Sequence, residues 1–208
     1  TRCKNQIKSL LSFYGFTIPE DMARSHWSGC FIKWLDGLNL QQESGKQTLV
    51  VLLSELKHLR GIIVQLTKQI RILAKQETYK VMVSYLDTIP GISTLSAMIF
   101  LTEIGDINRF NDLDHLASYV GLIPGEDSSG EVERVTGISH RRNTHLRSLL
   151  IECSWVAFRK DPVLLMAFNE LTKRMPKNQA IIRIARKLLN RIRYVMKNQQ
   201  PYVTGVVS

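Results

Sequence analysis

Apolar residues recur at alternating steps of three and four along residues 47–73, the most regular pattern in the chain. The seam contains Leu49, Leu52, Leu56, Leu59, Ile63, Leu66, Ile70 and Leu73. Such an a/d seam, flanked by polar residues and kept for several heptads, is typical of a coiled coil. We therefore predict a long helix in a coiled-coil arm over residues 46–82. The alternative is a long helix packed inside its own domain.

A proline-glycine turn follows the arm. The sequence "IPGIS" at residues 89–93 separates two apolar helical stretches, and the second stretch ends at Gly105. This arrangement is typical of a helix-hairpin-helix, in which a glycine lets two backbones approach and N–H groups of the second helix face a phosphate. Ser93 or Thr94 is expected to cap that helix. Gly91, Ser93 and Thr94 are thus candidate nucleic-acid contacts, and an ordinary αα-hairpin is the alternative.

Three more helices follow from their end signals. The first begins at Asn111 or Asp112 and ends before Gly121, and the second runs from about Asn143 to Lys160. The third starts at an Asp-Pro pair, residues 161–162, which is a typical helix start. A possible short β-ribbon near residues 130–138 separates the first two. The fold class is mostly α: a long coiled-coil helix and a helical domain that contains the helix-hairpin-helix.

The last predicted helix, residues 177–199, has one apolar face and one basic face. The basic face contains Arg183, Arg186, Lys187, Arg191 and Arg193. No acidic residue follows Glu170, whereas solvated charged faces normally mix both signs. These five basic residues are therefore predicted to bind nucleic-acid phosphates. A basic helix lying on a membrane is the alternative.

Charge and composition favour the nucleic-acid interpretation. The 208 residues carry a net charge of +10, which favours polyanionic partners. The most apolar run is too short to span a membrane, so we expect no membrane association and a cytoplasmic location. The 3 cysteines lie far apart without metal-ligand spacing, as in a reduced protein that has no zinc site. The chain also begins in mid-pattern, and we expect it to be the later part of a longer protein.

Two adjacent hydroxyls, Ser128 and Ser129, lie in a polar segment that is rich in arginine. The arginines are Arg134, Arg141, Arg142 and Arg147. A serine is a weak nucleophile until a base, a metal ion or strong electrostatics activates it, and guanidinium groups neutralise charge that develops on a phosphate. No carboxylates here have metal-binding spacing, so we expect no metal site in this chain. An inert connecting loop is the alternative for this segment.

The order of these motifs gives a resemblance to a known family. "IPGIS…TEIGDINRFNDLDHLASYVGLIPGEDSSG…GISHRRNTHLRSLLIE" resembles the transposase domain of bacterial insertion-sequence recombinases with a DEDD, RuvC-like N-terminal domain. The resemblance is specific from about Leu86 to Glu152. It implies an enzyme that cuts and rejoins DNA under the guidance of a structured non-coding RNA. It also implies that a serine attacks the phosphodiester, and it places this nucleophile at Ser129, with Ser128 as the alternative.

The same resemblance implies that Mg²⁺ is held by acidic residues of a RuvC-like domain outside this chain. The chain alone is then expected to lack strand-transfer activity. We predict four segments: residues 1–45 after the RuvC-like domain, the arm at 46–82, the transposase domain at 83–200, and a tail at 201–208. The expected partners are DNA, guide RNA and further copies of the chain through the arm. The alternative functions are a non-catalytic helix-hairpin-helix module for DNA binding and oligomerisation, and a coiled-coil adaptor.

Overall fold

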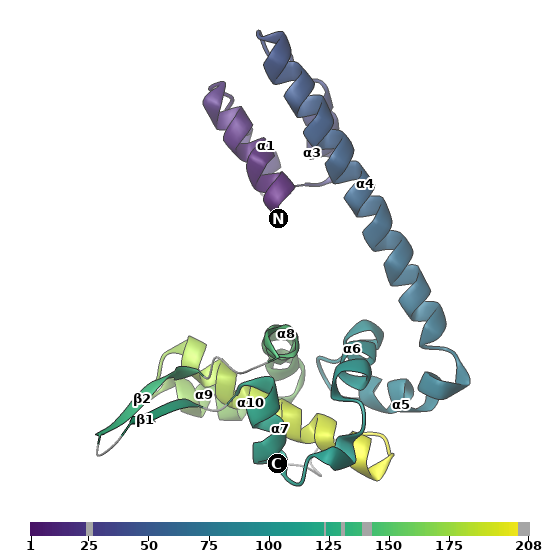
Figure 1. The fold of residues 1–208 in the computed structure, drawn as a ribbon, viewed down its shortest axis with the longest axis vertical. Helices are drawn as coiled ribbons and strands as arrows, with labels where there is room; N and C mark the ends of the chain where they lie inside the picture. The colour runs from purple at the N-terminus through teal and green to yellow at the C-terminus, as the bar shows by residue number, and fades with distance from the viewer. Residues whose placement is uncertain (24–26, 123, 130–131, 139–142, 204–208) are drawn as a thin grey trace. The chain divides into compact units, whose positions relative to one another are not determined.

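The computed structural model describes residues 1–23, 27–122, 124–129, 132–138 and 143–203, and along the two strands it describes the backbone alone. The elements in chain order are α1 (Arg2–Phe13), α2 (Glu20–Ala23), α3 (Gly29–Asp36), α4 (Glu43–Leu73), α5 (Glu77–Asp87), α6 (Thr94–Ile104), the 3₁₀ turn η1 (Ile107–Arg109), α7 (Leu113–Val120), β1 (Pro124–Ser129), β2 (Val132–Ile138), α8 (Thr144–Lys160), α9 (Pro162–Thr172) and α10 (Lys177–Asn198) (Figure 1). The chain is mostly helical, as the sequence predicts. No helix within the described residues is long and apolar enough to cross a membrane.

The chain divides into two compact units, Thr1–Lys68 and Gln69–Ser208. The first unit contains α1, α2, α3 and most of α4, and the second contains the end of α4 and every later element. The helical stretch predicted for residues 46–82 is divided into α4 and α5 by a turn at residues 74–76. The predicted arm therefore contributes to both units.

The first half of α4 packs inside its own unit. Leu49, Leu53 and Leu56 are buried there. Their neighbours in this core come from α1 and α3 and include Ile7, Leu11, Phe31 and Leu35. The seam residue Leu52 is only half-buried, and its carbonyl oxygen accepts a hydrogen bond from the Cys3 thiol across 3.2 Å. This half of α4 is therefore a helix packed within its own domain, which was the alternative to a coiled coil.

The second half of α4 presents its apolar residues to solvent. The exposed fractions of Leu59, Ile63 and Leu66 are 42%, 63% and 51%. These residues continue the heptad seam, and an apolar stripe of this kind on a long helix normally packs against another helix. The pairing of this half of α4 with another helix stays a prediction.

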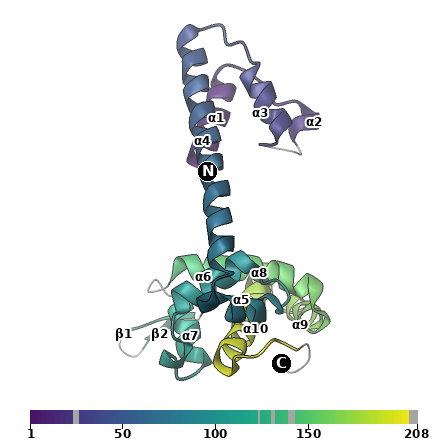
Figure 2. The ribbon, with the colours of Figure 1, turned by 90° about the vertical axis from the view of Figure 1, so that its right-hand side faces the viewer.

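The core of the second unit is organised around α10, which contacts α5, α7, α8 and α9 (Figure 2). Its buried stripe contains Arg191 and the apolar residues Ala180, Ile181, Ile184, Ala185, Leu188, Leu189, Ile192, Val195 and Met196. This stripe follows the helical period, so one face of α10 packs among its neighbours while the opposite face stays accessible. The packing fixes which basic residues of α10 reach the surface.

Side-chain caps begin several helices where the sequence predicts them. Asp112 accepts a hydrogen bond from the backbone N–H of His115 at the start of α7, across 2.7 Å. Asp161 accepts from two backbone N–H groups at the start of α9. Gly121 ends α7 in the left-handed conformation with φ of 81°. These local hydrogen bonds satisfy N–H groups that a helix end leaves open, which is why the boundaries are readable from sequence.

The polar segment between α7 and α8 contains an antiparallel pair, β1 and β2. The pair spans residues 124–138 and so starts earlier than the ribbon expected near residues 130–138. In its register Ser128 lies opposite Glu133, and Ser129 lies opposite Val132. The two serines thus occupy the last two positions of β1.

Candidate nucleic-acid interface

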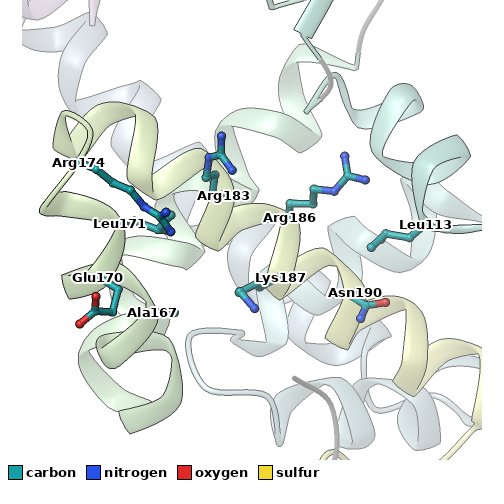
Figure 3. Close-up of a pocket in the computed structure, with 9 residues that line it drawn as sticks. All are labelled: Leu113, Ala167, Glu170, Leu171, Arg174, Arg183, Arg186, Lys187 and Asn190. Atoms are coloured by element: carbon teal, nitrogen blue, oxygen red, sulfur yellow. The ribbon is translucent and has the colours of Figure 1, made fainter.

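A basic pocket lies on the accessible side of α10. It has a volume of about 440 Å³ and is lined by Leu113, Ala167, Glu170, Leu171, Arg174, Arg183, Arg186, Lys187 and Asn190 (Figure 3). These side chains come from α7, α9, α10 and the turn between α9 and α10. The consecutive helices α9 and α10 and the distant helix α7 therefore build one concave site, with four basic side chains and one carboxylate.

The electrostatics of the pocket leave an excess of positive charge. Arg186 pairs with Asp114 of α7. Lys173 lies outside the pocket and forms an ion pair with Glu170, and this hydrogen bond and charge lower the pKa of the Glu170 carboxyl. Within the described part of the chain, Arg183 and Lys187 have no carboxylate in ion-pair contact. Such uncompensated cations favour an anionic ligand.

Of the five basic residues predicted on α10, three line this pocket: Arg183, Arg186 and Lys187. Sequence reasoning missed Arg174, because it lies in a turn outside the helical pattern. The signal for Arg174 was the absence of acidic residues after Glu170, which extends across that turn. Nucleic-acid binding by these residues stays a prediction.

Arg191 requires a correction. Its side chain is only 2% exposed, and its Nη1 atom donates to Oδ2 of Asp161 across 2.6 Å. Its guanidinium also lies 4.9 Å from the ring centre of Tyr202. Position 191 falls between Leu188 and Val195 on the buried stripe, so the charge is neutralised inside the protein. Arg191 is a structural residue and does not belong to the accessible basic face.

Arg193 lies at the edge of the packed region. It is half-buried, and its Nη2 atom donates to the backbone carbonyl of Asn111 across 3.1 Å. This bond ties α10 to the residue that precedes the start of α7. Arg193 therefore combines a positive charge with a contact that holds two elements of the domain together.

The proline-glycine hairpin is packed against α8. Gly91 has φ of 90°, and a Cβ atom at this position would lie 2.6 Å from the carbonyl oxygen of Cys153 and 2.8 Å from Cβ of Ala157. The close approach that requires a glycine is thus made to a helix of the same unit. This packing accounts for the glycine without a nucleic-acid backbone.

The start of the second hairpin helix is capped by Ser93. Its side chain accepts from the backbone N–H of Ser96, and the Ser96 hydroxyl accepts from the backbone N–H of Ser93 in return. Thr94, the other candidate cap, is the first residue of α6 and is half-buried. The expected cap is present, and contacts of Gly91, Ser93 and Thr94 with DNA stay predictions.

We call the pair of strands β1 and β2, with Ser128 and Ser129, the serine ribbon. The residues that precede and follow this ribbon are held by hydrogen bonds to the helical domain. At its entry, the backbone N–H of Leu122 donates to the carbonyl of Ala117 across 2.8 Å. At its exit, the backbone N–H of Asn143 donates to the carbonyl of Tyr119 across 3.1 Å, and its side-chain amide donates to Oε2 of Glu103 across 2.7 Å. Both anchors involve α7, so the two ends of the ribbon start from a fixed base.

Only some of the serines and arginines that are predicted to act in catalysis lie within the described residues. The backbone positions of Ser128, Ser129 and Arg134 are given by the strand register, and their side chains lie outside the description. Arg141 and Arg142 lie outside the described residues altogether. Arg147 is half-buried in α8. The proximity of the arginines to the serine hydroxyls therefore stays a prediction.

Titratable groups of the described residues do not gather into a metal site. No group of three or more His, Cys, Asp or Glu side chains among them is arranged to hold a metal ion. Burial raises the pKa of the Cys153 thiol, and a hydrogen bond with Ser96 partly opposes this effect. The Cys153 side chain is buried in the core of the second unit, so it acts as a packing group there.

Comparisons with known proteins agree with the order of motifs. Residues 83–169 match the family described as Transposase IS116/IS110/IS902 family. A putative transposase of Sinorhizobium fredii is 43% identical over 65 residues, which cover 31% of this chain and 17% of that protein. The transposase for insertion sequence element IS1111A of Coxiella burnetii is 28% identical over 207 residues, which cover 97% of this chain and 55% of that protein.

A protein named for a different activity also matches. The pilin gene-inverting protein of Moraxella bovis is 36% identical over 126 residues, covering 57% of this chain and 38% of that protein. The chain thus spans about half or less of the length of these three relatives. The family match begins within α5 and ends within α9, so it includes the hairpin, the serine ribbon and α8. Residues 83–169 are therefore identified as a transposase domain of the IS116/IS110/IS902 family.

Proposed function

We propose that the chain is the DNA-binding and strand-exchange part of a transposase in which Ser129 is the nucleophile. The observation that carries this proposal is the family match over residues 83–169, because it includes the ribbon with the Ser128-Ser129 pair. A relative that inverts a pilin gene supports DNA cutting and rejoining as the reaction class. Ser128 is the alternative nucleophile.

The proposed chemistry requires groups from outside the chain. A serine hydroxyl needs help to lose its proton before it attacks a phosphodiester, and the described residues contain no cluster that holds a metal ion. We propose that Mg²⁺ is bound by the acidic residues of a RuvC-like domain, as the resemblance implies. Arg134, Arg141, Arg142 and Arg147 then supply donors for the charge that develops on the phosphorus oxygens.

The same proposal assigns the recognition steps. Arg183 and Lys187 bind phosphates of DNA or guide RNA, since their charges are accessible and uncompensated in the described structure. The exposed apolar half of α4 pairs with another copy of the chain. Phosphate contacts position a nucleic acid without reading its sequence, so the guide RNA supplies target choice.

The test is to trap a covalent protein–DNA adduct on the full-length transposase and to map the modified residue by mass spectrometry. We expect the adduct on Ser129, and we expect Ser129→Ala to abolish both the adduct and recombination while DNA binding is kept. Ser128→Ala is the matched control and should retain the adduct. An adduct on another residue, or intact recombination by Ser129→Ala, would overturn the assignment. Intact recombination with no adduct would favour the non-catalytic binding module.

A further inference from the structure

The pocket beside α10 is lined by apolar as well as basic side chains, and phosphate binding does not use the apolar ones. Arg174, Arg183 and Lys187 provide positive charge, whereas Leu113, Ala167 and Leu171 provide apolar surface. In Figure 3 the basic residues of α10 lie between apolar side chains, with Leu113 of α7 at one side and Leu171 of α9 at the other. A site for bare phosphate requires only the cations.

The volume of the pocket fits a small organic group. A hollow of about 440 Å³ lies within the range of ligand sites, roughly 300–1,000 Å³. The Arg186–Asp114 ion pair links α10 to α7, and it holds Leu113 at the wall opposite α9. The site is therefore built from packed helices and does not depend on the strands.

We propose that this pocket binds one unstacked nucleotide of a single-stranded nucleic acid. The phosphate lies at Arg174 and Arg183, and the base or sugar lies against Leu113, Ala167 and Leu171. This inference rests on the proposed function in one respect, because it requires that the chain binds nucleic acid. It adds the state of the ligand: the nucleotide has left its stack.

The reason for a single strand is steric and chemical. Bases inside a duplex have both faces covered by their neighbours, so a duplex offers only backbone to the apolar walls of a hollow. An unstacked base can place its face on apolar side chains while its phosphate reaches a cation. An acidic peptide would satisfy the cations, but its short carboxylate side chains would leave the apolar walls uncovered.

The experiment uses the full-length protein and the charge-neutral substitution Ala167→Trp, which fills the pocket from α9. Met166→Trp is the matched control, since Met166 is on the same helix, is 70% exposed and does not line the pocket. Affinities are measured by fluorescence anisotropy for a short single-stranded DNA, the same strand without bases, and a duplex. Circular dichroism and thermal unfolding show whether each variant is folded. Arg183→Ala, which preserves the apolar walls, is a second variant.

We expect Ala167→Trp to weaken binding of the single strand about tenfold, as for the loss of one stacked base. Met166→Trp should leave this affinity unchanged, and duplex binding should be unchanged in both variants. The strand without bases should bind about tenfold more weakly to the wild type, and Ala167→Trp should weaken it no further. Arg183→Ala should weaken every ligand.

Three results would overturn the inference. The first is equal loss for single strand and duplex, which indicates a pocket for phosphate alone. The second is unchanged single-strand binding by a folded Ala167→Trp protein. The third is an acidic peptide that binds and is displaced by the tryptophan while DNA affinity stays constant. If Ala167→Trp does not fold, smaller filling by Ala167→Met gives the same comparison. The covalent adduct on Ser129 is measured separately, so failure here leaves the proposed nucleophile standing.

Discussion

The side-chain amide of Asn143 donates a hydrogen bond to Oε2 of Glu103 across 2.7 Å, although 40 positions separate the two residues. Asn143 also caps α8 by accepting from the backbone N–H of Leu146 across 3.0 Å. The Tyr119 hydroxyl donates to the carbonyl of Glu103 across 3.0 Å, so α6, α7 and the start of α8 meet at one point. This point is also where the chain returns from the serine ribbon.

Removal of this anchor should weaken both stability and recombination. We expect Asn143→Ala to lower the free energy of unfolding by about 1–2 kcal/mol, because it removes a helix cap and a tertiary hydrogen bond. Recombination by the full-length protein should fall further than stability explains, since the exit of the ribbon loses its side-chain bond to Glu103 and keeps only the backbone bond to Tyr119. Denaturant unfolding and a plasmid recombination assay measure the two effects. Thr144→Ala, at the exposed next position, is the control, and equal behaviour of the two variants would contradict the anchor role.

Arg191 and Lys187 should separate stability from binding. Arg191→Met should lower the free energy of unfolding by about 3–5 kcal/mol, because it leaves the buried Asp161 carboxylate without its partner. Lys187→Ala should leave stability nearly unchanged and should weaken DNA binding.

The measurement for this pair is DNA affinity as a function of salt, together with denaturant unfolding. Loss of one phosphate contact should reduce the slope of log affinity against log salt by about 0.9 for a duplex. We expect this change for Lys187→Ala and not for Arg191→Met measured below its unfolding transition. A reduced slope for Arg191→Met would place its charge on the nucleic-acid surface after all. A wild-type slope of zero would favour the adaptor.

Two glycine-to-alanine substitutions should have opposite effects on stability. Gly91 has φ of 90° and meets the α8 backbone, so Gly91→Ala should destabilise the second unit by more than about 1 kcal/mol. Gly61 lies inside α4 with nothing near an added Cβ atom, so Gly61→Ala should stabilise that helix by up to about 1 kcal/mol. Thermal unfolding measures both. Unchanged stability of Gly91→Ala with lost DNA binding would restore the hairpin glycine as a phosphate contact.

The three cysteines should react at different rates with a thiol reagent. Cys30 is exposed, whereas Cys3 and Cys153 are buried. Burial raises the pKa of the Cys3 and Cys153 thiols, so at a given pH less of each is thiolate, and their reaction should begin at higher pH. In the native chain we expect one fast thiol near pH 8 and all 3 after denaturation. Fast native labelling of Cys153, located by peptide mapping, would contradict the described core.

The exposed half of α4 should control oligomeric state. Ile63→Glu places a charge on the apolar stripe and should dissociate the assembly, because a buried charge without a partner is costly. Gln65→Glu adds the same charge at an exposed polar position of the same helix and should leave the assembly intact. Sedimentation velocity of the full-length protein gives the masses. Identical masses for the wild type and Ile63→Glu would refute pairing through this face.

Local signals in the sequence predicted most element boundaries. Asp112, Asn143 and Asp161 cap the helices that they were expected to begin, and Gly121 ends α7. These assignments succeed because caps and helical periods depend on residues within a few positions of each other. The order of motifs from the hairpin through the serine pair also identified the family that the comparison matched.

The same local reasoning was wrong where the partner was distant. It placed Arg191 on the basic face, although Asp161 and the surrounding core bury it. It also did not include Leu53 in the α4 seam, although Leu53 is buried in the first unit beside the half-buried seam residue Leu52. In both cases the neighbouring helices decide which side of the helix is buried, and the local pattern does not contain them.

The sequence by itself determined that the chain is helical and basic. It also showed motifs in the order found in transposases, with a serine pair between Gly121, which ends α7, and Asn143, which caps α8. Tertiary structure alone decided that α7, α9 and α10 enclose a pocket, that Gly91 meets α8, and that Glu103 holds the exit of the ribbon. The physical reason is the separation along the chain of the residues that interact. Periodicity and capping act between neighbours along the chain, whereas a concave site and a buried charge exist only when distant segments are packed together.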